Sequence, residues 1–120
     1  MRAAALLAAG VAAVAVIPAG MAGGAAKKAP KPRVVKVADD YFGPAKITGL
    51  TRGRTVLWKW LAVNGNTHDV KLKKAPKGVK KFHSDAATAD FTFKRKLKVK
   101  GKYVLICTFH EDMRMTIWVK

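Results

Sequence analysis

The chain has 120 residues, 24 lysines and arginines against seven acidic residues, and a formal net charge of +17. This length favours one domain, and so large a charge predicts attraction to anionic surfaces or acidic partners without bearing on the fold. A single cysteine excludes an internal disulfide. In an exported chain, three roles are then open to the cysteine: an intermolecular disulfide bridge, a reactive thiol or a metal ligand.

The first 26 residues differ from the rest of the chain. Met1 and Arg2 precede 24 uncharged residues, 3–26, which are apolar as far as Ile17 and then rich in small residues. This order predicts a secretory signal peptide over residues 1–26, and therefore export to the periplasm, the cell envelope or the extracellular space. The alternative is a retained membrane anchor, because 24 uncharged residues are long enough to span a bilayer.

Short strand patterns with turn signals between them fill the remainder. Residues 27–33, Lys-Lys-Ala-Pro-Lys-Pro-Arg, predict a basic, flexible linker. Residues 34–120 form the predicted domain, with a turn-like break at 39–43. The strand patterns lie at 34–37, 46–50, 55–60, 68–72, 91–93, 96–100, 102–107 and 116–119. Seven or eight short strands, without a long helical period, predict an all-β Greek-key sandwich.

Alternation within these strands predicts which side chains point inward. His68 shares one face with Val70 and Leu72, so its imidazole is expected to point into the core at the start of a strand. Four aromatic residues are predicted to belong to the core: Trp58, Trp60, Phe91 and Tyr103.

The stretch 107–115, Cys-Thr-Phe-His-Glu-Asp-Met-Arg-Met, concentrates soft metal ligands. It holds the only cysteine, one of three histidines and two of four methionines. Two histidines, a cysteine and a weak axial methionine are the ligands of a blue-copper electron-transfer site. The loop supplies Cys107, His110 and a methionine. The second histidine must come from elsewhere, and His68 can approach from the facing side.

Here the chain resembles the cupredoxins, the small blue-copper electron carriers, and especially amicyanin and the secreted plastocyanin-like proteins of bacteria. The resemblance covers nearly all of the predicted domain and runs through four stretches: Phe-Gly-Pro at 42–44, Arg-Gly-Arg-Thr-Val-Leu-Trp at 52–58, His-Asp-Val at 68–70, and Gly-Lys-Tyr-Val-Leu-Ile-Cys-Thr-Phe-His at 101–110. It implies one type 1 copper ion held by His68, Cys107, His110 and a methionine.

Two methionines compete for the axial position. Met113 has the short spacing of amicyanin, and Met115 has the longer spacing of plastocyanin and pseudoazurin. In the family, the last strand buries alternate residues at fixed distances from the ligand methionine, and Ile117 and Val119 fit the count from Met113. Met113 is therefore the predicted axial ligand. Met115 is the alternative, and otherwise a packing residue beside the site.

Two neighbours of the ligands depart from the family pattern. Asp69 stands where the family usually has an asparagine that braces the cysteine loop, and Phe109 stands where proline is common before the second histidine. Such neighbours tune a metal site, so the departures bear on the potential and spectrum more than on binding. His83 is expected to be exposed and structural, and Glu111 and Asp112 to be solvated acids.

The resemblance implies a monomer that carries single electrons and transforms no substrate, with the exposed edge of His110 as the electron port. Six of the nine residues 94–102 are basic. This patch is expected to steer an acidic redox partner or to associate with an anionic envelope or membrane surface; export argues against nucleic acid. The alternatives are an exported copper carrier or buffer, and a basic module that binds polyanions.

Overall fold

The computed structural model describes residues 30–120, so the predicted signal peptide and its alternative, a membrane anchor, lie outside the described residues. Residues 31–120 form one compact unit. A search of the described part of the chain for a helix long and apolar enough to cross a membrane found none.

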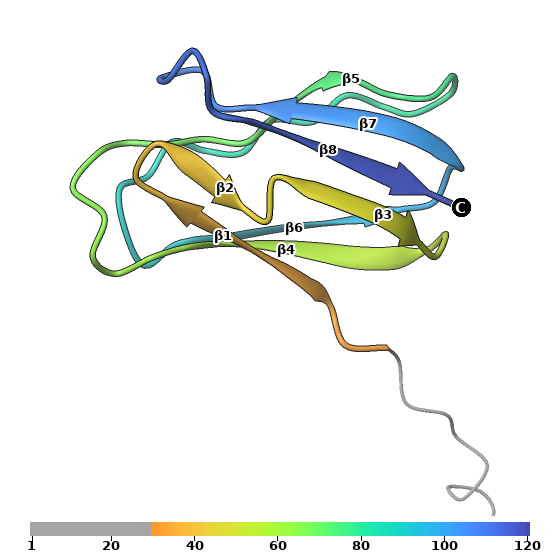
Figure 1. Cartoon of the computed structure of the whole chain (residues 1–120), viewed down its shortest axis with the longest axis horizontal. Coiled ribbons are helices and arrows are strands. Elements are labelled where there is room, and N and C mark those ends of the chain that lie inside the picture. Colours follow the sequence, from red (N-terminus) through yellow and green to blue (C-terminus); the bar gives the residue numbers. More distant parts are fainter. Residues whose placement is uncertain (1–29) are drawn as a thin grey trace, which may run out of the picture. The chain divides into compact units, whose positions relative to one another are not determined.

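Eight strands form two four-stranded sheets packed face to face (Figure 1). The strands are β1 (Arg33–Ala38), β2 (Tyr41–Gly43), β3 (Lys46–Leu50), β4 (Arg54–Trp60), β5 (Lys71–Lys74), β6 (Thr92–Leu97), β7 (Gly101–Ile106) and β8 (Arg114–Val119). One sheet has the order β2-β1-β4-β6, and the other has the order β3-β8-β7-β5. The predicted all-β sandwich is confirmed.

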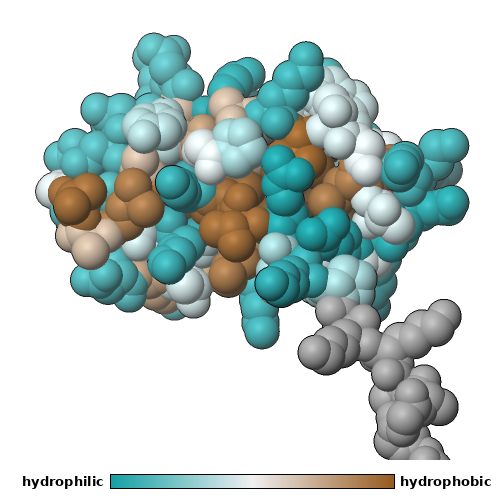
Figure 2. All heavy atoms as spheres, turned by 60° about the horizontal axis from the view of Figure 1, so that its bottom comes forward, coloured by the Kyte–Doolittle hydropathy of each residue, from teal (hydrophilic) through white to brown (hydrophobic). Residues whose placement is uncertain are grey.

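Alternating side chains of the two sheets make the core. Val56, Trp58 and Trp60 of β4 are at most 1% exposed, and Tyr103 and Leu105 of β7 face them from the other sheet. Two facing sheets each bury every second residue, which explains the period of two in these strands. On the outer surface in Figure 2, hydrophilic side chains break the apolar surface into separate patches.

Four connections gather at one end of the sandwich, which we call the Cys107 end. In one sheet, the parallel strands β1 and β4 end there, and the antiparallel strand β6 begins beside the end of β4. In the other sheet, β7 ends there, and β5 and β8 begin there. The Cys107 end comprises residues 38–41, 61–70, 84–91 and 107–113. The opposite end, which we call the far end, comprises residues 31–33, 51–54, 75–82, 97–102 and 120.

Three predicted elements have other bounds in the structure. The strand expected over 68–72 is β5, which begins only at Lys71 and ends at Lys74. Residues 39–43 were expected to form a turn, but only Asp39 and Asp40 turn, and Tyr41–Gly43 pair with β1 as strand β2. Residues 96–100 were expected to be a strand, but β6 ends at Leu97. Residues 98–100 leave the sheet, and the Tyr103 hydroxyl holds the Val99 backbone in the connection that they form.

Tyr103 fixes the connection between β6 and β7. Its hydroxyl donates to the Val99 carbonyl at 2.6 Å and accepts from the Val99 amide at 3.3 Å, and the residue is 1% exposed. Tyr103→Phe is expected to lower the free energy of unfolding by about 1–2 kcal/mol, because it leaves both backbone groups unpaired. Chemical denaturation measures this loss. Tyr41→Phe is the matched control, since Tyr41 is 57% exposed and should change stability by less than about 0.5 kcal/mol.

Candidate metal centre

Three side chains with metal-binding atoms meet at the Cys107 end. The donor atoms of His68, Cys107 and His110 all lie within 4.8 Å of one another. The Cys107 Sγ lies 3.6 Å from the His110 Nδ1, and the two imidazole rings are 4.8 Å apart between centroids. His68 and Cys107 are buried, and His110 is partly exposed. The structure thus brings His68 beside a loop that lies far along the chain, as the sequence predicted.

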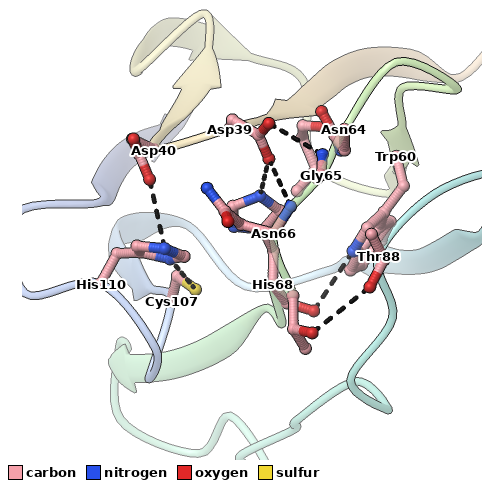
Figure 3. A network of polar contacts seen from close by, with 12 residues as sticks. Asp39, Asp40, Trp60, Asn64, Gly65, Asn66, His68, Thr88, Cys107 and His110 are labelled. Atoms are coloured by element: carbon pink, nitrogen blue, oxygen red, sulfur yellow. Dashed lines mark hydrogen bonds and ion pairs between the residues drawn. The ribbon is translucent and has the colours of Figure 1, made fainter.

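His68 is held from three sides. Its backbone pairs with Ala87 in both directions, at 2.9 and 3.0 Å, and its carbonyl accepts from the Trp60 indole at 3.2 Å. Its Nε2 lies 2.9 Å from an Asp39 carboxylate oxygen (Figure 3). These contacts fix the ring, and with it the direction of the remaining nitrogen.

That remaining nitrogen, the His68 Nδ1, is buried and has no hydrogen-bond partner among the described residues. A buried polar atom without a partner costs free energy, so such atoms are rare in folded proteins. The atom faces a cluster that also offers a thiol and a second imidazole. A soft metal ion bound there would supply the partner, and the donor set is the one that favours copper. The residues present therefore fit the ion that the sequence resemblance implies.

Asp39 braces His68 from the turn between β1 and β2. Its carboxylate accepts from the amides of Gly65, at 2.9 Å, and Asn66, at 3.1 Å. The Gly65 amide, followed by the His68 imidazole, holds the pKa of Asp39 below its usual value. A carboxylate behind a ligating imidazole fixes the ring orientation and raises its basicity. From the sequence, Asp39 was predicted only to lie in a turn, so its contact with His68 was not expected.

The Cys107 loop is closed by its own backbone. The Cys107 amide donates to the Met113 carbonyl at 2.9 Å, and the Met113 amide donates to the His110 carbonyl at 3.1 Å. The loop therefore places its thiol, imidazole and thioether residues on one tight turn. Burial raises the pKa of the Cys107 thiol. A cation bound beside it would reverse that penalty by stabilising the thiolate.

Asp69 ties the His68 segment to the Cys107 loop. It is 3% exposed and accepts from the Thr108 amide at 2.7 Å and from the Thr108 hydroxyl at 2.6 Å. Its second oxygen also lies 2.7 Å from the His83 Nε2. Burial raises the pKa of Asp69, but the bonds from His83 and Thr108 outweigh it and hold the pKa below its usual value.

His83 was expected to be exposed and structural. Its side chain is 48% exposed, and its role is to pair with Asp69. The sequence contains no local signal for this contact, because the two residues are separated by the whole of β5 and the loop that returns from it. The contact depends on the bridge between Lys71 and His83.

The two candidate methionines have different surroundings. Both are 1% exposed. Met115 lies within β8, opposite Leu105, and its sulfur accepts from the Trp58 indole at 3.3 Å. Met113 lies in the loop between Cys107 and β8, and its backbone closes the turn beside the cysteine.

The outer edge of the site is formed by His110. Its Nε2 lies 3.2 Å from an Asp40 carboxylate oxygen, and the side chain is 27% exposed (Figure 3). Phe109, beside it, is 53% exposed. Glu111 and Asp112 are exposed, as predicted. His110 thus has one nitrogen toward the buried cluster and the other at the surface.

Comparison with solved structures identifies the fold of this chain. No family model matches the chain, and no curated protein matches it. Solved structures do match. A reduced Cu(I) form of an amicyanin variant has a TM-score of 0.65 at 20% identity, over 78% of this chain and 87% of that one. An oxidised amicyanin variant has a TM-score of 0.64 at 19% identity over the same shares. This is the cupredoxin fold.

A larger protein contains the same fold. The copper-containing nitrite reductase from Thermus scotoductus SA-01 matches with a TM-score of 0.69 at 23% identity. The match covers 83% of this chain but 25% of the reductase chain. This chain therefore spans about a quarter of the reductase's length.

Proposed function

We propose that this chain is a type 1 copper protein that carries single electrons between redox partners. One observation carries the proposal: the buried, unpaired His68 Nδ1 lies in a cluster with the Cys107 thiol and the His110 imidazole. Copper bound there would supply a Cu(II)/Cu(I) couple. The chemistry of the donor set and the amicyanin-like fold both support this choice over zinc, which the same residue types also bind.

We assign His68, Cys107 and His110 as the strong ligands and Met113 as the weak axial one. Met115 is the less suitable candidate because its sulfur already accepts a hydrogen bond in the core. Asp39 orients His68, and Asp69 holds the Cys107 loop. Donors held by such contacts shift little when the charge of the site changes, so little reorganisation opposes electron transfer.

In this proposal, electrons enter and leave through the edge of His110, and no substrate is transformed. The partly exposed imidazole and the exposed Phe109 ring support a contact surface at this position. Export to the periplasm or cell envelope is part of the proposal and depends on the N-terminal sequence pattern. The predicted acidic surface of a redox partner would meet the basic residues 94–102 rather than the His110 edge, where the acidic residues of the chain lie, and it stays a prediction.

The test is the visible spectrum of the domain after addition of Cu(II). We expect an intense thiolate-to-copper band at about 600 nm that bleaches on reduction, and we expect Cys107→Ser to abolish it. Folded protein that binds copper without this band would contradict the proposal. Rapid loss of the copper to a competing chelator would instead favour a copper carrier.

A further inference from the structure

Positive and negative charges are separated along this sandwich. All seven acidic residues lie in the 29 residues of the Cys107 end, which contain no lysine or arginine. Of the 24 basic residues, Arg2, Lys27 and Lys28 lie outside the described residues, and the other 21 lie in the strands or at the far end. Neither the strands nor the far end contain an acidic residue. A protein with basic residues all over its surface would bind an anionic surface in any orientation. Here, the far end is the end that an anionic surface attracts.

An apolar hollow with a basic rim lies where strand β6 enters the far end. The hollow measures about 350 Å³ and lies between residues 78–82 and 95–99. Its apolar lining comes from five side chains: Val79, Phe82, Leu97, Val99 and Tyr103. Five cationic side chains surround it: Lys80, Lys81, Arg95, Lys96 and Lys98. The Arg95 guanidinium lies 5.5 Å from the Phe82 ring and 4.4 Å from the Phe93 ring, so the charged rim is packed on the apolar lining.

Anionic phospholipid has the chemistry that matches both features. Its phosphate suits the lysines of the rim, and its glycerol and first methylene groups suit the apolar lining. The basic residues spread over the whole far end, including Arg33, Arg52 and Lys100, which suits a broad charged surface better than a single small anion. Lys31, where the compact unit begins, lies at this end too, held by a bond from Arg54 to its carbonyl. Residues that precede it include the uncharged run 3–26.

We propose that the far end docks on an anionic phospholipid bilayer, with a headgroup in the hollow and the Cys107 end directed away from the membrane. Docking itself does not depend on copper. Its consequence, that the His110 edge is kept accessible to a redox partner, rests on the proposed function. The acidic Cys107 end reinforces the orientation, because the same membrane repels it.

The test is co-sedimentation of the copper-free and copper-loaded protein with vesicles. Vesicles of phosphatidylglycerol and phosphatidylcholine are expected to bind both forms, and pure phosphatidylcholine neither. One variant carries Lys80→Gln, Lys96→Gln and Lys98→Gln at the rim. Its matched control carries Lys36→Gln, Lys59→Gln and Lys71→Gln, three exposed lysines on strands toward the Cys107 end. The rim variant should bind on the order of a hundredfold more weakly, since each basic residue near an anionic surface contributes about tenfold or somewhat less. The control should lose less than roughly threefold.

Equal losses in the two variants would overturn the docking surface, because they would mean attraction by net charge alone. Absence of vesicle binding at about 0.15 M salt, with retained binding to polyglutamate, would overturn the membrane as the partner in favour of an acidic protein. Hydrogen exchange of the unaltered protein on vesicles gives an independent answer. Protection is expected over 77–82 and 95–102, and protection over 61–68 and 107–113 instead would contradict the orientation. Because vesicle binding is read without copper, its failure is distinct from failure of the spectrum.

Discussion

Met113→Leu is expected to raise the reduction potential of the copper-loaded protein, and Met113→Gln is expected to lower it. Leucine removes an axial donor that stabilises Cu(II) more than Cu(I). Glutamine replaces a soft thioether with a harder amide oxygen, which favours Cu(II). Opposite shifts at one position are the signature of a ligand, because a residue that acts only by packing has no reason to respond in this way. Voltammetry of the three proteins measures the shifts.

Met115→Leu is the matched control and should show the reverse pattern. Its potential and visible band should stay close to those of the unaltered protein. Its copper-free form should lose about 1–2 kcal/mol of unfolding free energy, because the Trp58 indole loses the sulfur to which it donates at 3.3 Å. Met113→Leu conserves volume at a buried site and should cost less than about 1.5 kcal/mol. A shift of potential in Met115→Leu, without one in Met113→Leu, would make Met115 the axial ligand.

The part of the site that could be predicted is the part that local patterns encode. Cys107 and His110 are three residues apart on one loop, so their proximity needs no knowledge of the fold. The inward direction of His68 was predicted from alternation with Val70 and Leu72, and it is confirmed by the burial of all three residues. The strict alternation itself does not hold over 68–70, because Asp69 is buried as well; β5 begins only at Lys71, and His68 pairs with Ala87 in an isolated bridge outside the sheets.

The contacts that brace the ligands depend on pairing between distant segments. Asp39 reaches His68 because β1 pairs with β4 in parallel, which brings the turn after β1 beside the loop after β4. The pairing of two parallel strands leaves no periodic pattern in the sequence of either strand. For the same reason, the turn residues Asp39 and Asp40 were not expected to contact either histidine. The sequence shows the net charge of the chain but not the separation of acidic from basic residues, because that separation depends on which loops lie at the same end of the sandwich.

Asp69→Ala is expected to be among the most damaging single substitutions outside the ligands. It removes the acceptor of two bonds from Thr108, at 2.7 and 2.6 Å, and leaves the amide and hydroxyl of that residue without this partner beside the cysteine. Removing the charged acceptor of such hydrogen bonds typically costs about 1.5–3 kcal/mol. We expect a loss of that size in chemical denaturation, together with a weakened copper band, since within residues 30–120 no other side-chain hydrogen bond joins the Cys107 loop to the His68 segment.

Asp69→Asn separates the hydrogen bonds from the charge. The amide oxygen can still accept from the Thr108 amide, and the Thr108 hydroxyl can turn to accept from the new NH₂ group. Asparagine is also the residue that the cupredoxin resemblance leads one to expect at this position. The loss of stability should therefore fall to about 1 kcal/mol, and the copper band should persist. A loss as large as that of the alanine variant would show that the negative charge, rather than the brace, stabilises the loop.

His83→Ala completes the comparison. Its imidazole is half exposed, so solvent screens its pair with Asp69, and we expect a cost within about 1 kcal/mol. In the double variant with Asp69→Ala, the His83 substitution should cost nothing further, since its partner is already gone. If His83→Ala alone destabilised the protein as much as Asp69→Ala, the ion pair would be the main brace and the bonds to Thr108 secondary. The structure favours the opposite order, because Thr108 contributes two short bonds from within the loop that carries Cys107.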